Sequence, residues 1–100
     1  MAMAKYASTR DELLDRMVAD GWGNRSSGDA EAAGGSVALV TISDAEKAEC
    51  VDAMSEALAE LGVEMPVGNF IVRSEAGEVT VREYPSEPAA TAAYLALAAA

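Results

Sequence analysis

Carboxylates are the most abundant side chains in this sequence that could carry out chemistry, because 17 of its 100 residues are Asp or Glu. Paired carboxylates can act as general acid and base, and glycoside hydrolysis sets two of them ~5–10 Å apart across a cleft that holds a sugar. Helical spacing supplies that distance, but so small a domain offers little room for the cleft. We therefore expect no enzymatic activity, with a small carboxylate enzyme as one alternative.

The sequence contains no histidine and one cysteine, Cys50. Without imidazole, Ser-His-Asp and Cys-His catalysis, the common zinc sites and the usual proton shuttle near neutral pH are excluded. Glu46 and Glu49 precede Cys50, and neighbouring carboxylates raise a thiol pKa, which disfavours the nucleophilic thiolate. We predict that Cys50 lies at the edge of the core, and that the chain has no catalytic residue, cofactor site or metal site.

Motifs for binding phosphate or nucleic acid are weak. Gly34-Gly35-Ser36 precedes a predicted strand, whereas phosphate-binding loops follow a strand and open a helix. The seven basic residues are scattered from Lys5 to Arg82, and the formal net charge of −10 repels phosphate backbones and anionic membrane surfaces. We expect no direct nucleic-acid binding and no membrane binding, and a partner protein with a basic surface.

Four acidic residues form the most distinctive pattern, at positions i, i+3, i+7 and i+11 of a helix predicted over 44–61. We call them the acidic stripe: Glu49, Asp52, Glu56 and Glu60. Like charges at helical spacing cost ~0.2–0.5 kcal/mol per pair, and interspersed lysines would have removed that cost. The stripe is either a solvated face in an acidic chain or a docking surface for a basic partner.

Trp22 is a second candidate contact residue. It follows Gly21, which suits the left-handed position just past the first predicted helix, so Trp22 can pack back onto Met17 and staple the helix end. Beside a mobile loop, the same side chain could anchor a partner. Our leading hypothesis is a non-enzymatic acidic interaction module that binds a basic surface through the acidic stripe, with Trp22 and the 23–36 loop contributing.

Two further hypotheses come from other classes of protein. One is an acidic inhibitor of a nucleic-acid-handling enzyme, of the phage anti-defence or DNA-mimic type. Successive stripe carboxylates rise ~5–6 Å along the helix axis, whereas duplex DNA carries a charge every ~1.7 Å, so the imitation would be sparse. The other is a small self-assembling structural protein, suggested by exposed sheet edges and an alanine-rich last helix. We also consider a homodimer.

Local signals define the first half of the chain. A capping box at Thr9–Glu12 predicts a helix with an apolar face at Leu13, Leu14, Met17 and Val18. The apolar run of residues 37–42 predicts a strand buried on both faces. A second capping box at Ser43–Glu46 opens the 44–61 helix, which Gly62 ends and which has a predicted buried row of Val51, Met54, Leu58 and Leu61.

The second half predicts a β-hairpin and a last helix. Strands over 69–73 and 79–84 flank a link in which Gly77 supplies a positive φ. Ser86 caps the last helix, with Pro88 in its first turn, and the alanines of 89–100 predict weak docking. The expected fold is α+β, in the order α-β-α-β-β-α, with a three-stranded mixed sheet packed by helices.

Length predicts one domain over residues 1–100, with a frayed leader at 1–7 and a flexible loop at 23–36. We find no signal-peptide pattern at the start and no apolar run near the ~18 residues that span a bilayer. With one cysteine and no intramolecular disulfide, we expect a reducing cytoplasm. The alanine-rich, lysine-poor composition suggests a bacterial or phage source.

Overall fold

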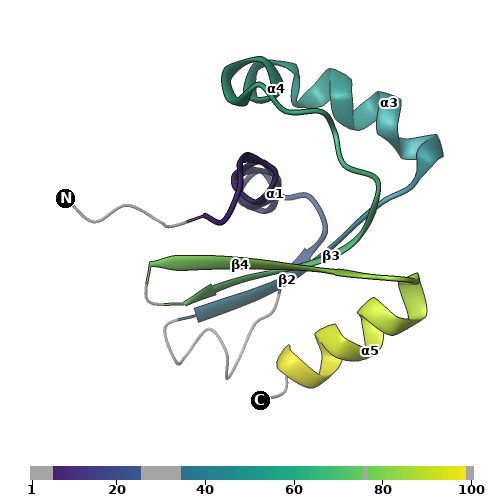
Figure 1. The fold of residues 1–100 in the computed structure, drawn as a ribbon. Helices are drawn as coiled ribbons and strands as arrows, with labels where there is room; N and C mark the ends of the chain where they lie inside the picture. The colour runs from purple at the N-terminus through teal and green to yellow at the C-terminus, as the bar shows by residue number, and fades with distance from the viewer. Residues whose placement is uncertain (1–5, 26–34, 76, 99–100) are drawn as a thin grey trace.

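The computed structural model describes residues 6–25, 35–75 and 77–98, and it shows an antiparallel sheet with helices on both faces (Figure 1). Three long strands and one strand of two residues form the sheet, in the spatial order β1-β2-β3-β4. The predicted α+β class is therefore confirmed. The elements in chain order are α1 (Thr9–Ala19), β1 (Asn24–Arg25), β2 (Gly35–Ile42), α3 (Asp44–Ala53), α4 (Ser55–Leu61), β3 (Gly68–Glu75), β4 (Glu78–Tyr84) and α5 (Glu87–Ala98).

The expected mixed sheet is wrong, because every neighbouring pair of strands is antiparallel. The register of β2 and β3 runs from Gly35 opposite Glu75 to Ile42 opposite Gly68. The connection through α3 and α4 thus leaves β2 at Ile42 and enters β3 directly opposite that residue. Since it begins and ends at the same end of the sheet, it reverses the chain and makes no parallel crossover.

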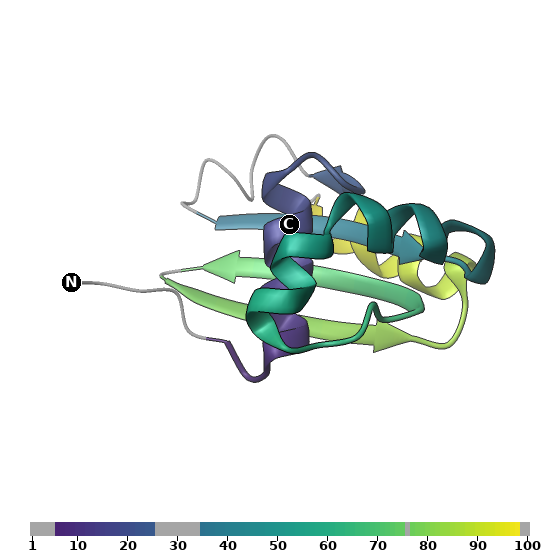
Figure 2. The same ribbon diagram turned by 90° about the horizontal axis from the view of Figure 1, so that it is seen from above.

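The predicted helix over 44–61 is divided at Met54, where φ is −108° and the backbone leaves the helical region. Figure 2 shows that the chain changes direction between α3 and α4. Met54 is buried at the bend, so the bend brings both helices to the core. The observed order gains α4 and also β1, which lies in the range predicted as a loop. The end of that predicted loop is also wrong, because β2 already begins at Gly35; residues 26–34 of the loop and residues 1–5 of the predicted leader lie outside the described residues.

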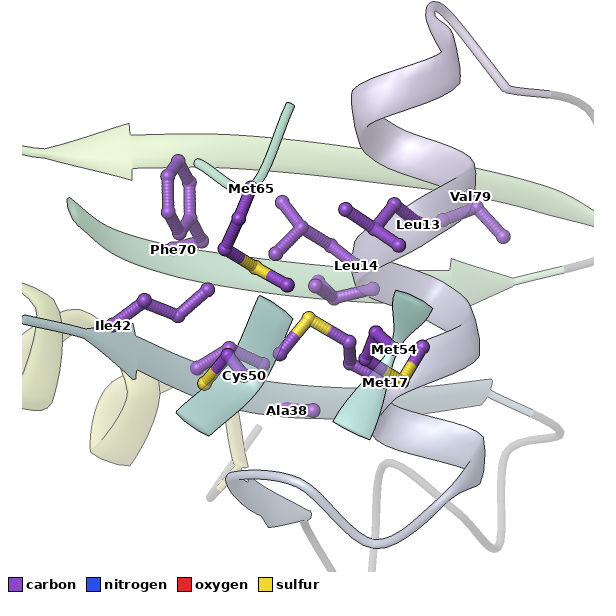
Figure 3. Close-up of a cluster of buried hydrophobic side chains, with 12 residues drawn as sticks. Leu13, Leu14, Met17, Ala38, Ile42, Cys50, Met54, Met65, Phe70 and Val79 are labelled. Carbon is purple, nitrogen blue, oxygen red and sulfur yellow. The ribbon is translucent and has the colours of Figure 1, made fainter. Parts of the chain in front are cut away.

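The face of the sheet under α1 carries the larger core, drawn in Figure 3. α1, α3, the bend at Met54 and all three long strands contribute to it, which ties the helix layer to the sheet. We call it the major core; its buried members are Leu13, Leu14, Met17, Ala38, Val40, Ile42, Cys50, Met54, Met65, Phe70, Val72 and Val79.

The predicted capping box of α1 is displaced by one residue. Ser8 is the N-cap, and its Oγ accepts a hydrogen bond from the Asp11 backbone N–H at 3.3 Å. Thr9 is already helical, and the Glu12 carboxylate accepts from Arg16 Nη2 at 3.1 Å instead of reaching back to the cap. Either residue can cap a helix, and the local pattern alone did not separate Ser8 from Thr9.

The opposite face of the sheet carries a smaller core beneath α5, and we call it the minor core. Its buried members are Val37, Leu39, Ile71 and Ala90. Ser86 caps α5 as predicted, since its Oγ accepts from the Ala89 backbone N–H at 3.3 Å. β2 supplies buried residues to both cores, which confirms the prediction that this strand is buried on both faces.

Candidate partner-binding surface

α3 is a helix that buries a single side chain, Cys50, which is 2% exposed. A surface helix usually buries a stripe along its whole length. Local interactions hold α3 instead: Ser43 Oγ accepts from the Glu46 backbone N–H at 3.2 Å, and the Ser43 backbone N–H donates to Glu46 Oε1 at 3.3 Å. This confirms the predicted capping box. The rest of α3 faces solvent.

All four residues of the acidic stripe are exposed, but they do not form one straight row. Glu49 and Asp52 lie on α3, whereas Glu56 and Glu60 lie on α4, beyond the change of direction at Met54 (Figure 2). The bend therefore separates the stripe into two pairs of carboxylates on two helices. The sequence predicted their exposure and missed the bend, because helical periodicity assumes a continuous axis.

Glu60 is held by Arg16 of α1 in a two-pronged ion pair. Arg16 Nη1 donates to Glu60 Oε2 at 3.2 Å, and Arg16 Nη2 donates to Glu60 Oε1 at 3.3 Å. These hydrogen bonds and the guanidinium charge lower the pKa of the Glu60 carboxyl below its usual range. Within the described part of the chain, the other three stripe residues form no ion pair, and their side chains are exposed to solvent: Glu49, Asp52 and Glu56.

Two shallow depressions flank the bend. One, of about 440 Å³, lies between α1 and α4, and its charged lining comprises Arg16, Asp20, Glu56 and Glu60. Asp20 is a contribution that sequence reasoning missed, because only the packing of α1 against α4 brings it to these glutamates. The second, of about 510 Å³, lies on α3, and its lining comprises Asp44, Lys47, Ala48, Val51 and Asp52.

Val51 contradicts the predicted buried row, because its side chain is 39% exposed. Cys50 takes its place in the major core, and Leu58 and Leu61 of α4 are half-buried against that core. The bend at Met54 changes which side of α3 meets the sheet, so a row calculated for a straight helix misplaces Val51. The consequence is an exposed apolar side chain beside Asp52.

Trp22 is half-buried against the major core, and its backbone N–H donates to the Met17 carbonyl at 2.9 Å. Gly21 before it has a φ of 96°, as predicted for the residue past the helix. This geometry accounts for Trp22 as a staple of the α1 end. Trp22 does not line the depressions described on α3 and between α1 and α4.

Cys50 carries the one thiol of the sequence, and its surroundings oppose thiolate formation. Burial raises its pKa most, and the charges of Glu46 and Glu49 raise it further. The predicted position of Cys50 near the core is confirmed, since it is buried in the major core.

A buried carboxylate on α1 was not anticipated. Asp11 is 3% exposed, and its Oδ1 accepts from Arg10 Nη2 at 3.2 Å. Arg10 also lies 3.5 Å from Glu83 of β4 and sits over the Phe70 ring. The contacts of Arg10 with Glu83 and Phe70 join residues distant in sequence, so no local pattern predicts them, and they tie the start of α1 to the sheet.

Among the described residues, no group of three or more Cys, Asp or Glu side chains is placed to hold a metal ion. No helix in the described ranges has both the length and the apolar character needed to cross a bilayer. Comparison with protein-family models, curated proteins and solved structures finds no match to this chain.

Proposed function

We propose that the protein is a non-enzymatic interaction module that binds a basic surface of another protein through α3 and the start of α4. The observation that carries the proposal is the exposure of α3, which buries only Cys50. We call the proposed contact the acidic face; it is centred on Asp52, which lies beside Val51 in the depression on α3 and one turn from Glu49, and it continues to Glu56 beyond the bend. It combines three carboxylates without ion pairs in the described structure with one exposed apolar side chain.

Charge and apolar contact have separate tasks in such an interface. The net charge of −10 steers a basic partner toward this protein, and the carboxylates at the rim of the interface repel acidic competitors. Affinity depends more on apolar contacts that become buried at the centre, and Val51 supplies one. Glu60 contributes least to this scheme, because Arg16 already neutralises it.

This arrangement supports binding to a basic protein surface in general better than it supports imitation of DNA at the DNA-binding site of an enzyme. Duplex DNA carries a charge every ~1.7 Å along its axis. The bend at Met54 interrupts the row of carboxylates, and the pairing of Glu60 with Arg16 removes one of them. No specific contact in the described structure favours the DNA-mimic alternative, so we propose the broader class of partner.

The test is charge reversal on the acidic face with a matched control elsewhere. The double variant Asp52→Lys/Glu56→Lys changes the net charge from −10 to −6, and so does Glu75→Lys/Glu87→Lys on β3 and α5. The probe is a fluorescent helical peptide with one lysine-rich face, titrated at low and at physiological salt. We expect the first variant to weaken binding at least about tenfold and the control to weaken it far less.

Two outcomes of that titration would contradict the proposal. Equal loss in both double variants would mean that net charge alone attracts the peptide. Unchanged affinity of the Asp52→Lys/Glu56→Lys variant at low salt would mean that the acidic face is not the contact.

A further inference from the structure

β4 is an edge strand in the described structure, because it pairs with β3 on one side and with no described strand on the other. Figure 2 shows β4 outermost in the sheet, with the first turn of α1 passing over it in the helix layer. Alternate residues of an edge strand direct their backbone N–H and C=O groups away from the sheet. These groups can pair with another strand.

Two charged residues of β4 have no ion-pair partner among the described residues. Glu78 lies directly opposite Glu75 in the β3–β4 register, and Arg73 pairs with Glu75 at 3.5 Å. Glu78 and Arg82 form no ion pair among the described residues, and Arg82 lies over the Tyr84 ring at 5.4 Å. Like charges directly opposite each other across two strands are unfavourable, so Glu78 would gain from a cation on its open side.

The five residues from Glu78 to Arg82 are complementary to themselves. Their order is Glu-Val-Thr-Val-Arg, so antiparallel pairing of two copies centred on Thr80 places Glu78 of each copy opposite Arg82 of the other. The same register places Val79 opposite Val81, and Thr80 opposite Thr80. Glu78, Thr80 and Arg82 share one face of the sheet and the valines share the other, so every pair joins side chains on the same face.

Neighbouring registers lack this match. Centring the pairing on Val81 places Glu78 opposite Tyr84 and Arg82 opposite Thr80, so no ion pair forms. Centring it on Arg82 places two like charges in direct opposition. We propose that the protein forms a symmetric homodimer through β4, centred on Thr80, in which the β2-β3-β4 strands of two copies make one continuous sheet.

The proposed dimer has a consequence for the acidic face. The twofold axis of this pairing is perpendicular to the sheet, so both copies keep α1, α3 and α4 on the same side. The two acidic faces therefore point to one side of the dimer, and a partner with repeated basic segments could engage both. Each dimer contact uses β4 and leaves the acidic face free, so this inference and the proposed function can fail separately.

A charge swap tests the register. Arg82→Glu places acid opposite acid and Glu78→Arg places base opposite base, whereas the double variant Glu78→Arg/Arg82→Glu restores opposite charges. Sedimentation equilibrium across micromolar to millimolar concentrations should show a wild-type dimer. Each single variant should raise the dimer dissociation constant at least about tenfold, and the double variant should recover most of that loss.

Cross-linking tests the centre of the pairing independently. In a Cys50→Ala background, Thr80→Cys should form a covalent dimer under mild oxidation, because residue 80 faces its own copy. Arg82→Cys, two residues away on the same face, should do so much more slowly. A wild-type monomer at millimolar concentration, a double swap that recovers no association, or equal cross-linking at 80 and 82 would overturn the proposal.

Discussion

The two faces of the sheet differ in how much they bury. The major core joins α1, α3, the Met54 bend and three strands, whereas the minor core has four buried residues, one of them the alanine Ala90 of α5. Neighbours on β3 illustrate the contrast, because Phe70 and Val72 enter the major core while Ile71 between them enters the minor core. The helix layer that carries the acidic face is therefore anchored to the sheet by the major core, although α3 itself buries only Cys50.

The difference in burial between the two faces is tested most strongly by truncating one leucine on each face. Leu14 is 0% exposed in the major core, and its replacement by alanine should cost ~2–5 kcal/mol of unfolding free energy. Leu97 of α5 is only half-buried, so Leu97→Ala should cost under ~1 kcal/mol. Urea denaturation measures both values, and similar costs would show that the faces are equally packed.

Two glycine substitutions should have intermediate effects, and they probe how the chain leaves α1 and α4. Gly23 and Gly62 both have positive φ, at 77° and 64°. A Cβ at Gly62 meets open space, so Gly62→Ala should cost ~1–2 kcal/mol from backbone strain alone. A Cβ at Gly23 would collide with the Leu39 carbonyl oxygen of β2, so Gly23→Ala should cost more. Thermal unfolding of the two variants checks this order, and a reversed order would contradict the packing of Gly23 against β2.

The smallest expected effect is the loss of the Arg16–Glu60 ion pair, which bridges α1 and α4 at the surface. The pKa of Glu60 is lowered in the folded state, so its contribution to stability is present above the unfolded pKa of ~4.3 and is lost as pH falls through the folded pKa. Glu60→Gln should therefore lower the melting temperature slightly at pH 7 and by less at pH 3.

The matched control for this prediction is Glu56→Gln, since Glu56 lies on the same helix and forms no ion pair among the described residues. It should show no comparable pH-dependent loss. A loss for Glu60→Gln that persists undiminished at pH 3 would argue against the ion pair as its cause.

Local chemistry in the sequence was enough to predict most elements. The Ser43–Glu46 capping box, the left-handed Gly62, the Ser86 cap and the alternation around Gly77 each depend on residues close in the chain. The exposure of the stripe residues followed from helical spacing in the same way.

Features that depend on distant contacts were missed. Whether β2 and β3 run antiparallel is decided by where the α3–α4 connection returns, and the bend places Met54 in a core shared with α1 and the sheet. The exposure of Val51 follows from that bend. The pairing of Glu60 with Arg16 joins residues 44 positions apart, so no spacing rule could find it.

The most direct test of the central claim is to map where a basic peptide touches the protein. Amide chemical shifts of the ¹⁵N-labelled protein, recorded while the lysine-faced peptide is added, report contacts residue by residue. The account predicts that the largest shifts fall on residues 49–56 of α3 and α4, and that they disappear in the Asp52→Lys/Glu56→Lys variant. Shifts centred on α5 or spread evenly over the acidic side chains would contradict it.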